Sequence, residues 1–360
     1  MTMTTSVIVG IGGVVVGAAL VSAEKNTPPR TDRWPAERVR QWYEKQPWLC
    51  GFNYVPSTAV NTTEMWQAQT FDPKTIDREL SWAHGIGFNT CRVFVQYLVW
   101  KHDPDGLKRR IDRFLTIASK HRISVMPVLF DDCAFSGKEP YLGKQDDPVS
   151  GVHNSGWTAS PGLKRVTDRS VWPDLERYVT DVVGWFARDR RVVVWDLYNE
   201  PGNSKMGNKS LPLLEAAFGW ARTAGPTQPL TVGVWNDRLG DLNRCCLERS
   251  DVISFHRYGR LEAVQGQIAK LKARKRPILC TEWMSRSLGS RFETDLPVFK
   301  AEKVGCYAWG LVNGKTQTHF PWGSPKGALA PKVWHHDLLR KDGKPYRPEE
   351  IKTIRQATRN

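Results

Sequence analysis

The stretch that decides the fold is residues 192–201, VVVWDLYNEP. Apart from Asp196 it is apolar at consecutive positions up to Tyr198, and it opens on three β-branched valines. A continuous apolar run of this length is typical of a parallel strand buried on both faces. A proline ends the run, and Glu200 stands immediately before it. The stretch therefore predicts a buried parallel strand with a carboxylate at its carboxyl end, and Asp196 is expected to be a buried, hydrogen-bonded structural acid.

Short apolar segments of the same kind recur along the chain. They cover residues 48–55, 90–95, 124–130, 229–234, 252–258, 277–283 and 305–312. Amphipathic segments with apolar residues three and four apart separate most of them, at 72–85, 105–121, 172–188, 211–224, 261–273 and, more briefly, 298–304. This alternation predicts βαβ units, and eight such strands predict a single α/β domain, a closed (β/α)8 TIM barrel. A doubly wound open sheet is the alternative, but no GxGxxG turn follows the first strand, so nothing indicates a dinucleotide.

One connection is far longer than the others. Residues 131–170 join the third strand to the helix that begins near Trp172, whereas loops beyond about 15 residues are usually functional or disordered. In a barrel this loop lies on the face formed by the carboxyl ends of the strands, where barrel enzymes keep their active sites. Several of its residues are therefore candidates to contact a ligand: Asp131, Asp132, His153, Asn154 and Trp157.

The N-terminus differs in kind from the rest. Residues 6–23 are apolar and uncharged, and small residues precede Glu24. We expect 1–23 to be a secretory signal peptide, although the usual basic residues before the apolar run are missing. An uncleaved membrane anchor is the second interpretation, since about 20 residues span a bilayer, and a wrongly assigned start is the third. We expect residues 24–44 to form a linker and an N-terminal helix, and residues 45–360 to form the barrel domain. The leader predicts that the protein is secreted or periplasmic, or that an uncleaved anchor holds it at a membrane.

The composition excludes several classes of protein. Of the 360 residues, 40% are hydrophobic and 25% are charged, which suits a globular chain and not a disordered or fibrous one. The net charge of +15 raises the prospect of an anionic partner. The basic residues form no long tail and are mixed with acidic ones, so we expect no nucleic-acid partner. The positive charge leaves open an acidic glycan as the substrate.

The cysteines, histidines and tryptophans allow further expectations. Seven cysteines are present without a CxxC pair, and four of them lie in apolar runs, where they are expected to be buried free thiols. Cys133, Cys245 and Cys246 have polar neighbours, so a disulfide among them stays open. No spacing of His, Cys or carboxylate residues indicates a metal, and no motif indicates a cofactor. Three tryptophans on helical segments are expected in the core, namely Trp82, Trp185 and Trp220.

Two glutamates stand at the carboxyl ends of predicted strands. Glu200 follows the fourth strand, and Glu282 lies near the end of the seventh, PILCTEW at 277–283. Although they are far apart in the chain, both point into one mouth if the strands close into a barrel. An ionised carboxylate is costly to bury unless it is paired or functional. This pair is therefore predicted to be the catalytic centre.

With these residues the chain resembles the clan A glycoside hydrolases, and among them family 5 and its relatives, the cellulase and β-mannanase group. The resemblance covers about residues 45–345, and it rests on Asn199-Glu200-Pro201 after one strand together with Glu282 at the end of a later one. It implies a retaining mechanism with two carboxylates. Glu200 is then the acid/base and Glu282 the nucleophile.

Further positions match the pattern of that group. Arg92 in TCRVF corresponds to an arginine that holds the nucleophile, and His256 and Tyr258 in FHRY correspond to a His-x-Tyr pair on the sixth strand. Trp309 in YAWG corresponds to a tryptophan that floors the sugar site, and Asn199 is expected to bond the sugar 2-hydroxyl. Further candidates for contact with the sugar are Tyr54, Asp131, Trp157 and Trp283.

The resemblance implies a retaining β-glycoside hydrolase that cleaves O-glycosidic bonds of a β-linked polysaccharide or oligosaccharide, with β-mannan or β-glucan as the expected substrate. A transglycosylase that uses the same intermediate and a glycan-binding barrel without activity are the alternatives. The sequence departs from the group at residues 281 and 283–285, where glycines are usual near the nucleophile, and at residues 131–132, where many relatives carry a histidine. These departures leave the sugar specificity open, and nothing indicates an oligomeric state.

Overall fold

A parallel β-barrel organises the chain in the computed structural model, which describes residues 1–2 and 33–359. Nearly all of the predicted signal peptide or anchor, and most of the linker after it, lie outside the described residues. Within the described part, no helix has the length and apolar character needed to cross a membrane. The strands are β1 (Cys50–Tyr54), β2 (Thr90–Phe94), β3 (Ser124–Asp131), β4 (Trp195–Asn199), β5 (Leu230–Thr231), β6 (Gly233–Val234), β7 (Ile253–His256), β8 (Ile278–Glu282) and β9 (Gly305–Trp309).

The strands are all parallel and follow the order β5-β4-β3-β2-β1-β9-β8-β7-β6. Only Val232 separates β5 from β6, and these two short strands pair with β4 and β7 respectively. They are therefore two halves of the fifth barrel strand, and through them the sheet closes into a barrel. The predicted (β/α)8 barrel is confirmed, with β7, β8 and β9 as its sixth, seventh and eighth strands.

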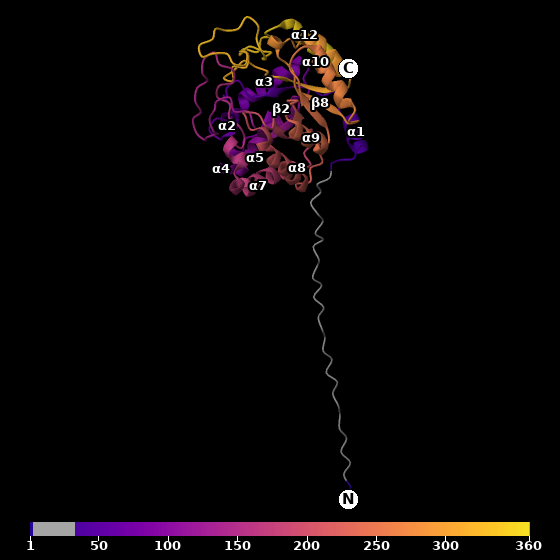
Figure 1. Cartoon of the computed structure of the whole chain (residues 1–360). Coiled ribbons are helices and arrows are strands. Elements are labelled where there is room, and N and C mark those ends of the chain that lie inside the picture. Colours follow the sequence, from indigo (N-terminus) through magenta and orange to yellow (C-terminus); the bar gives the residue numbers. More distant parts are fainter. Residues whose placement is uncertain (3–32, 360) are drawn as a thin grey trace.

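Helices cover the outside of this barrel (Figure 1). They are α1 (Ala36–Glu44), α2 (Thr62–Trp66), α3 (Pro73–Ile86), α4 (Tyr97–His102), α5 (Pro104–Lys120), α6 (Leu163–Thr167), α7 (Trp172–Trp185), α8 (Leu211–Thr223), α9 (Gly240–Arg249), α10 (Leu261–Lys272), α11 (Phe292–Ala301) and α12 (Pro348–Thr358). Local chemistry explains two of the starts, because Asp72 and Asp103 each accept a backbone N–H of the first turn and each precedes a proline. The helices predicted at 72–85, 105–121, 172–188, 211–224 and 261–273 correspond to α3, α5, α7, α8 and α10, whereas α11 begins six residues before the predicted 298–304.

Some expectations about single residues are wrong. Trp185 was expected in the core, but its side chain stays 62% exposed at the end of α7. All seven cysteines are buried and free, so Cys133, Cys245 and Cys246 form no disulfide. The helix α9 carries two of these thiols inward, and it was not predicted because charged residues interrupt its apolar face. Burial of the thiols therefore follows from a helix that the sequence pattern did not reveal.

The two ends of the barrel differ. At the amino-terminal end, Trp34 and Val39 pack against side chains from inside the barrel, among them Met126, Val194 and Tyr307. This end is filled by apolar side chains. At the other end, the long loops after β3 and β9 lie side by side, in magenta and yellow at the upper left of Figure 1. The carboxyl ends of the strands thus remain the place for a site.

Candidate active site

A fully buried arginine on β2 is the centre of the polar network inside the barrel. Arg92 donates through Nε to Asp196 (2.9 Å) and through Nη2 to Asn199 (2.7 Å). Its Nη1 donates to Asn53 (2.9 Å) and to Glu282 Oε1 (2.8 Å). The guanidinium is planar and has five donors, so it holds these four side chains in one arrangement. Asp196 is a buried acid paired to Arg92, as expected for a structural residue.

Glu282 ends β8, and only 5% of it is exposed. Besides the bond from Arg92, its Oε2 accepts a hydrogen bond from the Tyr258 hydroxyl (2.6 Å). The ladder between β7 and β8 shifts register between Phe255 and His256, so that His256 pairs with Glu282. Bulges of this kind re-aim side chains beside active sites. Both oxygens of Glu282 are thus hydrogen-bonded, Oε1 to Arg92 and Oε2 to Tyr258.

Glu200 follows directly after β4, with a backbone φ of +43°. A non-glycine residue in this left-handed region is strained, and such strain gathers at functional sites. Its Oε1 lies 2.9 Å from His256 Nδ1, and its Oε2 accepts from the Asn203 amide and the Cys133 thiol (3.4 Å). One oxygen of Glu200, one oxygen of Glu282 and a ring nitrogen of His256 all lie within 4.8 Å of one another. The two carboxyl groups therefore face each other across the mouth.

Burial sets the electrostatics of these groups. It raises the pKa of both Glu200 and Glu282, and it lowers the pKa of His256 to about 4, so the imidazole is neutral at pH 7. Arg92 contacts Glu282 directly, and its positive charge opposes the rise in the pKa of Glu282. Burial also raises the pKa of Tyr258 well above its usual value, so the hydroxyl keeps its proton and remains a donor.

The trio of Glu200, His256 and Glu282 is the one group in the described part whose ligand atoms are close enough to hold a metal ion. Each carboxyl already has donors from the protein, namely Arg92 and Tyr258 on Glu282 and Asn203 on Glu200. A divalent cation would have to displace these donors and sit close to a guanidinium. The donor set therefore fits a metal centre poorly.

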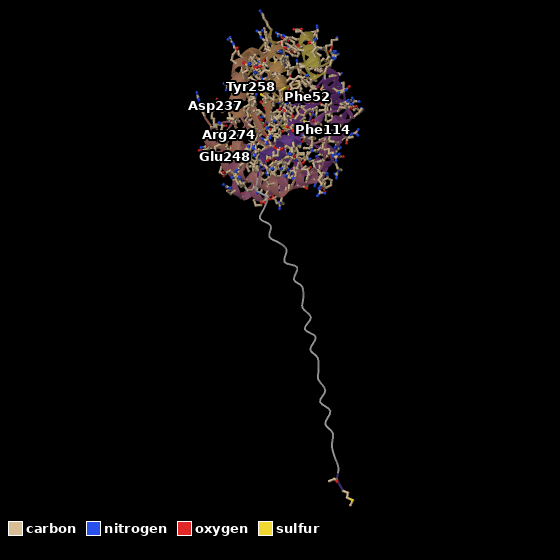
Figure 2. All side chains as sticks on the ribbon, turned by 90° about the vertical axis from the view of Figure 1, so that its right-hand side faces the viewer. Phe52, Phe114, Asp237, Glu248, Tyr258 and Arg274 are labelled. Atoms are coloured by element: carbon tan, nitrogen blue, oxygen red, sulfur yellow. The ribbon has the colours of Figure 1, made fainter. Side chains whose placement is uncertain are left out.

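The paired carboxyls open into a cavity of about 400 Å³. Aromatic side chains give it flat apolar walls, and amides and imidazoles add polar atoms, a mixture that suits a sugar. Its lining residues are Cys133, Phe135, His153, Asn154, Trp157, Asn199, Glu200, Asn203, Trp235, His256, Arg257, Tyr258, Glu282, Trp309, Trp322 and His336. In Figure 2, Tyr258 lies above Arg274 and Glu248 on the same side of the molecule.

The structure gathers most of the residues predicted from the sequence at this cavity. Those that line it are Asn199, Glu200, His256, Tyr258, Glu282, Trp309, His153, Asn154 and Trp157. Arg92 lies below them and reaches the cavity through Asn199 and Glu282. Asp131 is also behind the lining, where it accepts from Trp157 Nε1 (2.7 Å) and from Asn199 Nδ2 (2.8 Å). Asp131 is therefore placed to position two lining residues and does not itself line the cavity.

Three other candidates lie elsewhere. The Tyr54 hydroxyl donates to Glu79 on α3 (3.0 Å), in the layer between barrel and helices. Asp132 accepts from Tyr198 and from backbone beyond the strand ends, and it is fully buried. Trp283 packs edge-on against aromatic rings of α11. The alternation of side chains along a strand explains two of these, since Asn53 and Glu282 point inward and their next neighbours must point outward.

Sequence reasoning missed seven lining residues, namely Cys133, Phe135, Asn203, Trp235, Arg257, Trp322 and His336. Two of them had a local signal. Trp235 directly follows the fifth barrel strand, and Asn203 follows Glu200 by one turn after Pro-Gly. Trp322 and His336 lie in a segment without helical or strand periodicity, so nothing local pointed to them.

The fold and the cavity together define a class: a (β/α)8 barrel with two opposed carboxyls at the mouth. No family model matches the chain, and no curated protein is similar to it in sequence. Solved structures resemble it in fold. An endo-β-1,4-mannanase from Thermotoga petrophila has a TM-score of 0.56 at 13% identity, over 88% of this chain and 77% of that one.

Two further neighbours have the same architecture. An exo-β-1,4-mannosidase from Opitutaceae bacterium strain TAV5 gives a TM-score of 0.60 at 17% identity, over 86% of this chain and 59% of that one. A GH5_18 protein from Streptomyces cattleya, in complex with Manβ1-4GlcNAc, gives 0.56 at 13% identity, over 87% and 79%. At these identities the likeness establishes the fold.

Proposed function

We propose that the protein is a β-glycoside hydrolase that acts with retention of configuration. The observation that carries this proposal is the opposition of Glu200 and Glu282, with one oxygen of each within 4.8 Å of the other. Retaining glycosidases hold their two carboxyl groups about 5–5.5 Å apart, whereas inverting ones leave about 6.5–9.5 Å for a water molecule. The spacing in this chain favours the retaining arrangement.

The surroundings assign a different role to each carboxyl. Glu282 touches the Arg92 cation and the Tyr258 hydroxyl, and both stabilise its ionised form. The partners of Glu200 are neutral: an amide, a thiol and an imidazole with a lowered pKa. When two neighbouring carboxyl groups share one proton, the proton resides on the group that has no cation beside it, which here is Glu200. Glu282 is therefore the nucleophile and Glu200 the proton donor.

The reaction proceeds in two displacements. With a sugar seated on Trp309, the Glu282 carboxylate attacks the anomeric carbon while Glu200 gives its proton to the departing glycosidic oxygen. A glycosyl ester on Glu282 results. Glu200, now a carboxylate, takes a proton from water, the water oxygen attacks the anomeric carbon, and Glu282 leaves as a carboxylate. Asn199 Oδ1 accepts a hydrogen bond from Arg92, so the Asn199 amide nitrogen is turned toward Asp131 and the cavity. From there this nitrogen can donate a hydrogen bond to a sugar 2-hydroxyl.

A β-linked mannan or glucan is the proposed substrate class. The fold neighbours include proteins described as an endo-β-1,4-mannanase, an exo-β-1,4-mannosidase and a β-glucosidase. The cavity offers aromatic faces in Trp157, Trp235, Trp309 and Trp322, which suit stacking against a pyranose ring.

The stereochemical course of hydrolysis tests the proposal. A panel of aryl β-glycosides and β-linked oligosaccharides is screened, and the first product of any substrate that is cleaved is followed by proton NMR. We expect the β-anomer of the released sugar to appear first and then to mutarotate. An α-anomer as the first product contradicts retention, and failure to cleave any β-glycoside contradicts the hydrolase itself.

Tyr258→Phe is expected to move the acidic limb of the pH profile upward. The substitution removes the hydrogen bond to Glu282 Oε2, and a bond to a charged group is worth about 1.5–3 kcal/mol. The ionised form loses this stabilisation, so the pKa of Glu282 rises further. Because attack requires the carboxylate, kcat/KM then falls at a higher pH than in the wild type. An unchanged acidic limb contradicts this role of Tyr258.

A further inference from the structure

The end of the barrel opposite the cavity carries an excess of basic residues. The strands are all parallel and the helices after them run back, so the helix carboxyl ends and the loops from helix to strand lie at this end. We call it the amino face; in Figure 1 it lies with α1 on the right, away from the loops after β3 and β9. The last helical turns there carry Arg222, Lys272, Lys300 and Arg355.

A second set of cations lies beyond the helix ends. A positive side chain in a last turn is favoured by the helix dipole, but that effect falls off within the turn. The loops from helix to strand nevertheless add basic residues that are exposed, and no ion pair or hydrogen bond joins their side chains to the described part of the chain. These residues are Lys45, Arg122, Arg188, Arg190, Arg274, Lys275 and Lys303.

The acidic residues of the same loops are already neutralised. Each of them forms an ion pair with an arginine or a lysine of this face, and the pairs are Asp189 with Arg191 (2.5 Å), Asp251 with Arg222 (2.7 Å) and Glu302 with Lys272. The exposed cations therefore have no acidic partner in these loops, and their charge faces the solvent.

The charges at the cavity end, in contrast, are of both signs. Ion pairs cross its loops, for example Lys138 with Asp146 (2.5 Å) and Arg165 with Glu139 (3.4 Å). The first turns of the helices there add acidic residues, which are Asp105, Asp174, Asp241, Glu262, Glu293, Asp295, Glu349 and Glu350. Much of the net charge of +15 is therefore concentrated on the amino face.

The positive groups of the amino face lie close enough to repel one another. Arg33 lies there, since its Nε donates to Ser250 O just ahead of β7. Burial, together with the nearby charge of Arg276, lowers the pKa of Arg33 to about 10. Asp251 is the acid that Arg33, Arg222 and Arg276 share. An anion brought to this face would relieve the repulsion among these arginines.

The chain enters the barrel at the same face. Trp34 N donates to Asp251 Oδ1 (2.7 Å), and Trp34 and Val39 pack against the amino ends of the strands. Only residues 24–32 separate this face from the apolar stretch at 6–23, which the sequence predicts to be a signal peptide or an anchor. Nine residues reach at most ~30 Å even when fully extended. A membrane that held the apolar stretch would therefore lie within reach of the amino face.

We propose that the amino face docks on the surface of an anionic phospholipid membrane, with the cavity turned away from the lipid. The unpaired cations precede β1, β3, β4, β8 and β9 alike, so they surround the barrel axis. A planar surface can approach cations on all sides of the axis together, whereas a single polymer chain would contact one row of them. Each basic residue close to an anionic surface adds about fivefold to the affinity. The proposal does not depend on the reaction proposed for Glu200 and Glu282.

Cosedimentation of the full chain with lipid vesicles tests the proposal. One set of vesicles is made of phosphatidylcholine, and the other is an equal mixture of phosphatidylcholine and phosphatidylglycerol. The measured quantity is the ratio of the two partition coefficients, so any contribution of residues 1–23 that is independent of lipid charge cancels. We expect the anionic vesicles to be favoured ~100-fold or more at low salt, and this preference to fall steeply with added salt, because exposed charges are screened. A ratio near one at low salt overturns the proposal.

Removing charge from one end of the barrel or the other locates the contact. The amino-face variant combines Arg188→Gln, Arg190→Gln, Arg274→Gln and Lys275→Gln. The matched control removes as many exposed lysines from loops at the cavity end, where they also lack ion pairs with the described residues: Lys164→Gln, Lys205→Gln, Lys209→Gln and Lys326→Gln. Both variants should keep the wild-type thermal midpoint, since none of these side chains has a partner to lose.

We expect the preference for anionic vesicles to fall ~100-fold in the amino-face variant and less than about threefold in the control. Equal losses in the two variants overturn the proposal, because net charge alone would then explain the binding.

An anionic polysaccharide is the competing partner for a basic face. Polygalacturonate is therefore added to the anionic vesicles at a carboxylate concentration equal to that of phosphatidylglycerol. We expect most of the protein to stay on the vesicles, because a membrane contacts the cations on every side of the barrel. Displacement of the protein by the polymer assigns the face to an acidic polymer and overturns the membrane proposal.

Discussion

Replacing Glu282 by alanine is expected to reduce turnover of an aryl β-glycoside by ~10⁴-fold or more, because the covalent path is lost. Azide at high concentration should restore turnover. The small anion fits the space of the missing carboxylate, on the side of Arg92, and attacks the anomeric carbon from the face opposite to the leaving group. The product is then an α-glycosyl azide, which NMR identifies.

Two further variants sharpen this result. Glu282→Gln keeps the shape of the side chain and should be equally inactive, so full activity in that variant contradicts the nucleophile assignment. Glu248→Ala is the matched control, since Glu248 is an exposed residue of α9 far from Tyr258 in Figure 2. It should keep wild-type activity. A β-glycosyl azide from the Glu282→Ala variant would instead identify Glu282 as the acid/base residue.

Replacing Glu200 by alanine is expected to have an effect that depends on the leaving group. General acid catalysis contributes about 10²–10⁴-fold, so substrates with poor leaving groups, such as oligosaccharides, should slow by that amount. A 2,4-dinitrophenyl β-glycoside needs no proton and should still form the covalent intermediate, which then accumulates as a burst. Azide should release it as a β-glycosyl azide, the anomer opposite to that from Glu282→Ala.

The pH dependence supplies a separate check on Glu200. In the wild type kcat/KM should fall as pH rises past the pKa of this residue, which burial raises, because the proton donor is then lost. The Glu200→Ala variant should lack this basic limb when assayed with the dinitrophenyl substrate. A slowdown that is the same for good and poor leaving groups contradicts the acid/base assignment.

Much of the fold could be predicted from local patterns. The eight barrel strands are runs of apolar residues, and the burial of both faces that such runs indicate is what the barrel provides. The helices α3, α5, α7, α8 and α10 were predicted from their apolar faces, and Asp72 with Pro73 marked the start of α3. The helix α12, which buries Ile351 and Ile354, was not predicted. The helix α9 escaped because its buried face is made of Leu242 and two cysteines between charged residues.

The site divides in the same way. Side chains at strand ends could be predicted, since parallel strands deliver their carboxyl ends to one mouth. Tyr54 and Trp283 failed as sugar contacts because each neighbours an inward-pointing residue, and strand alternation turns it toward the helices. This period of two was present in the sequence, so the outward direction of both residues was predictable in principle.

The sequence alone thus determined the barrel and the paired carboxyls Glu200 and Glu282, because both depend on apolar runs and on the residues at their ends. Only the tertiary structure decided the shape of the cavity. Part of its lining is held by hydrogen bonds between residues such as Asn154 and Thr316, which are far apart in the chain and lie in loops without periodicity. Such contacts leave no local pattern, since they arise only after the closed barrel brings the loops after β3 and β9 to the same rim.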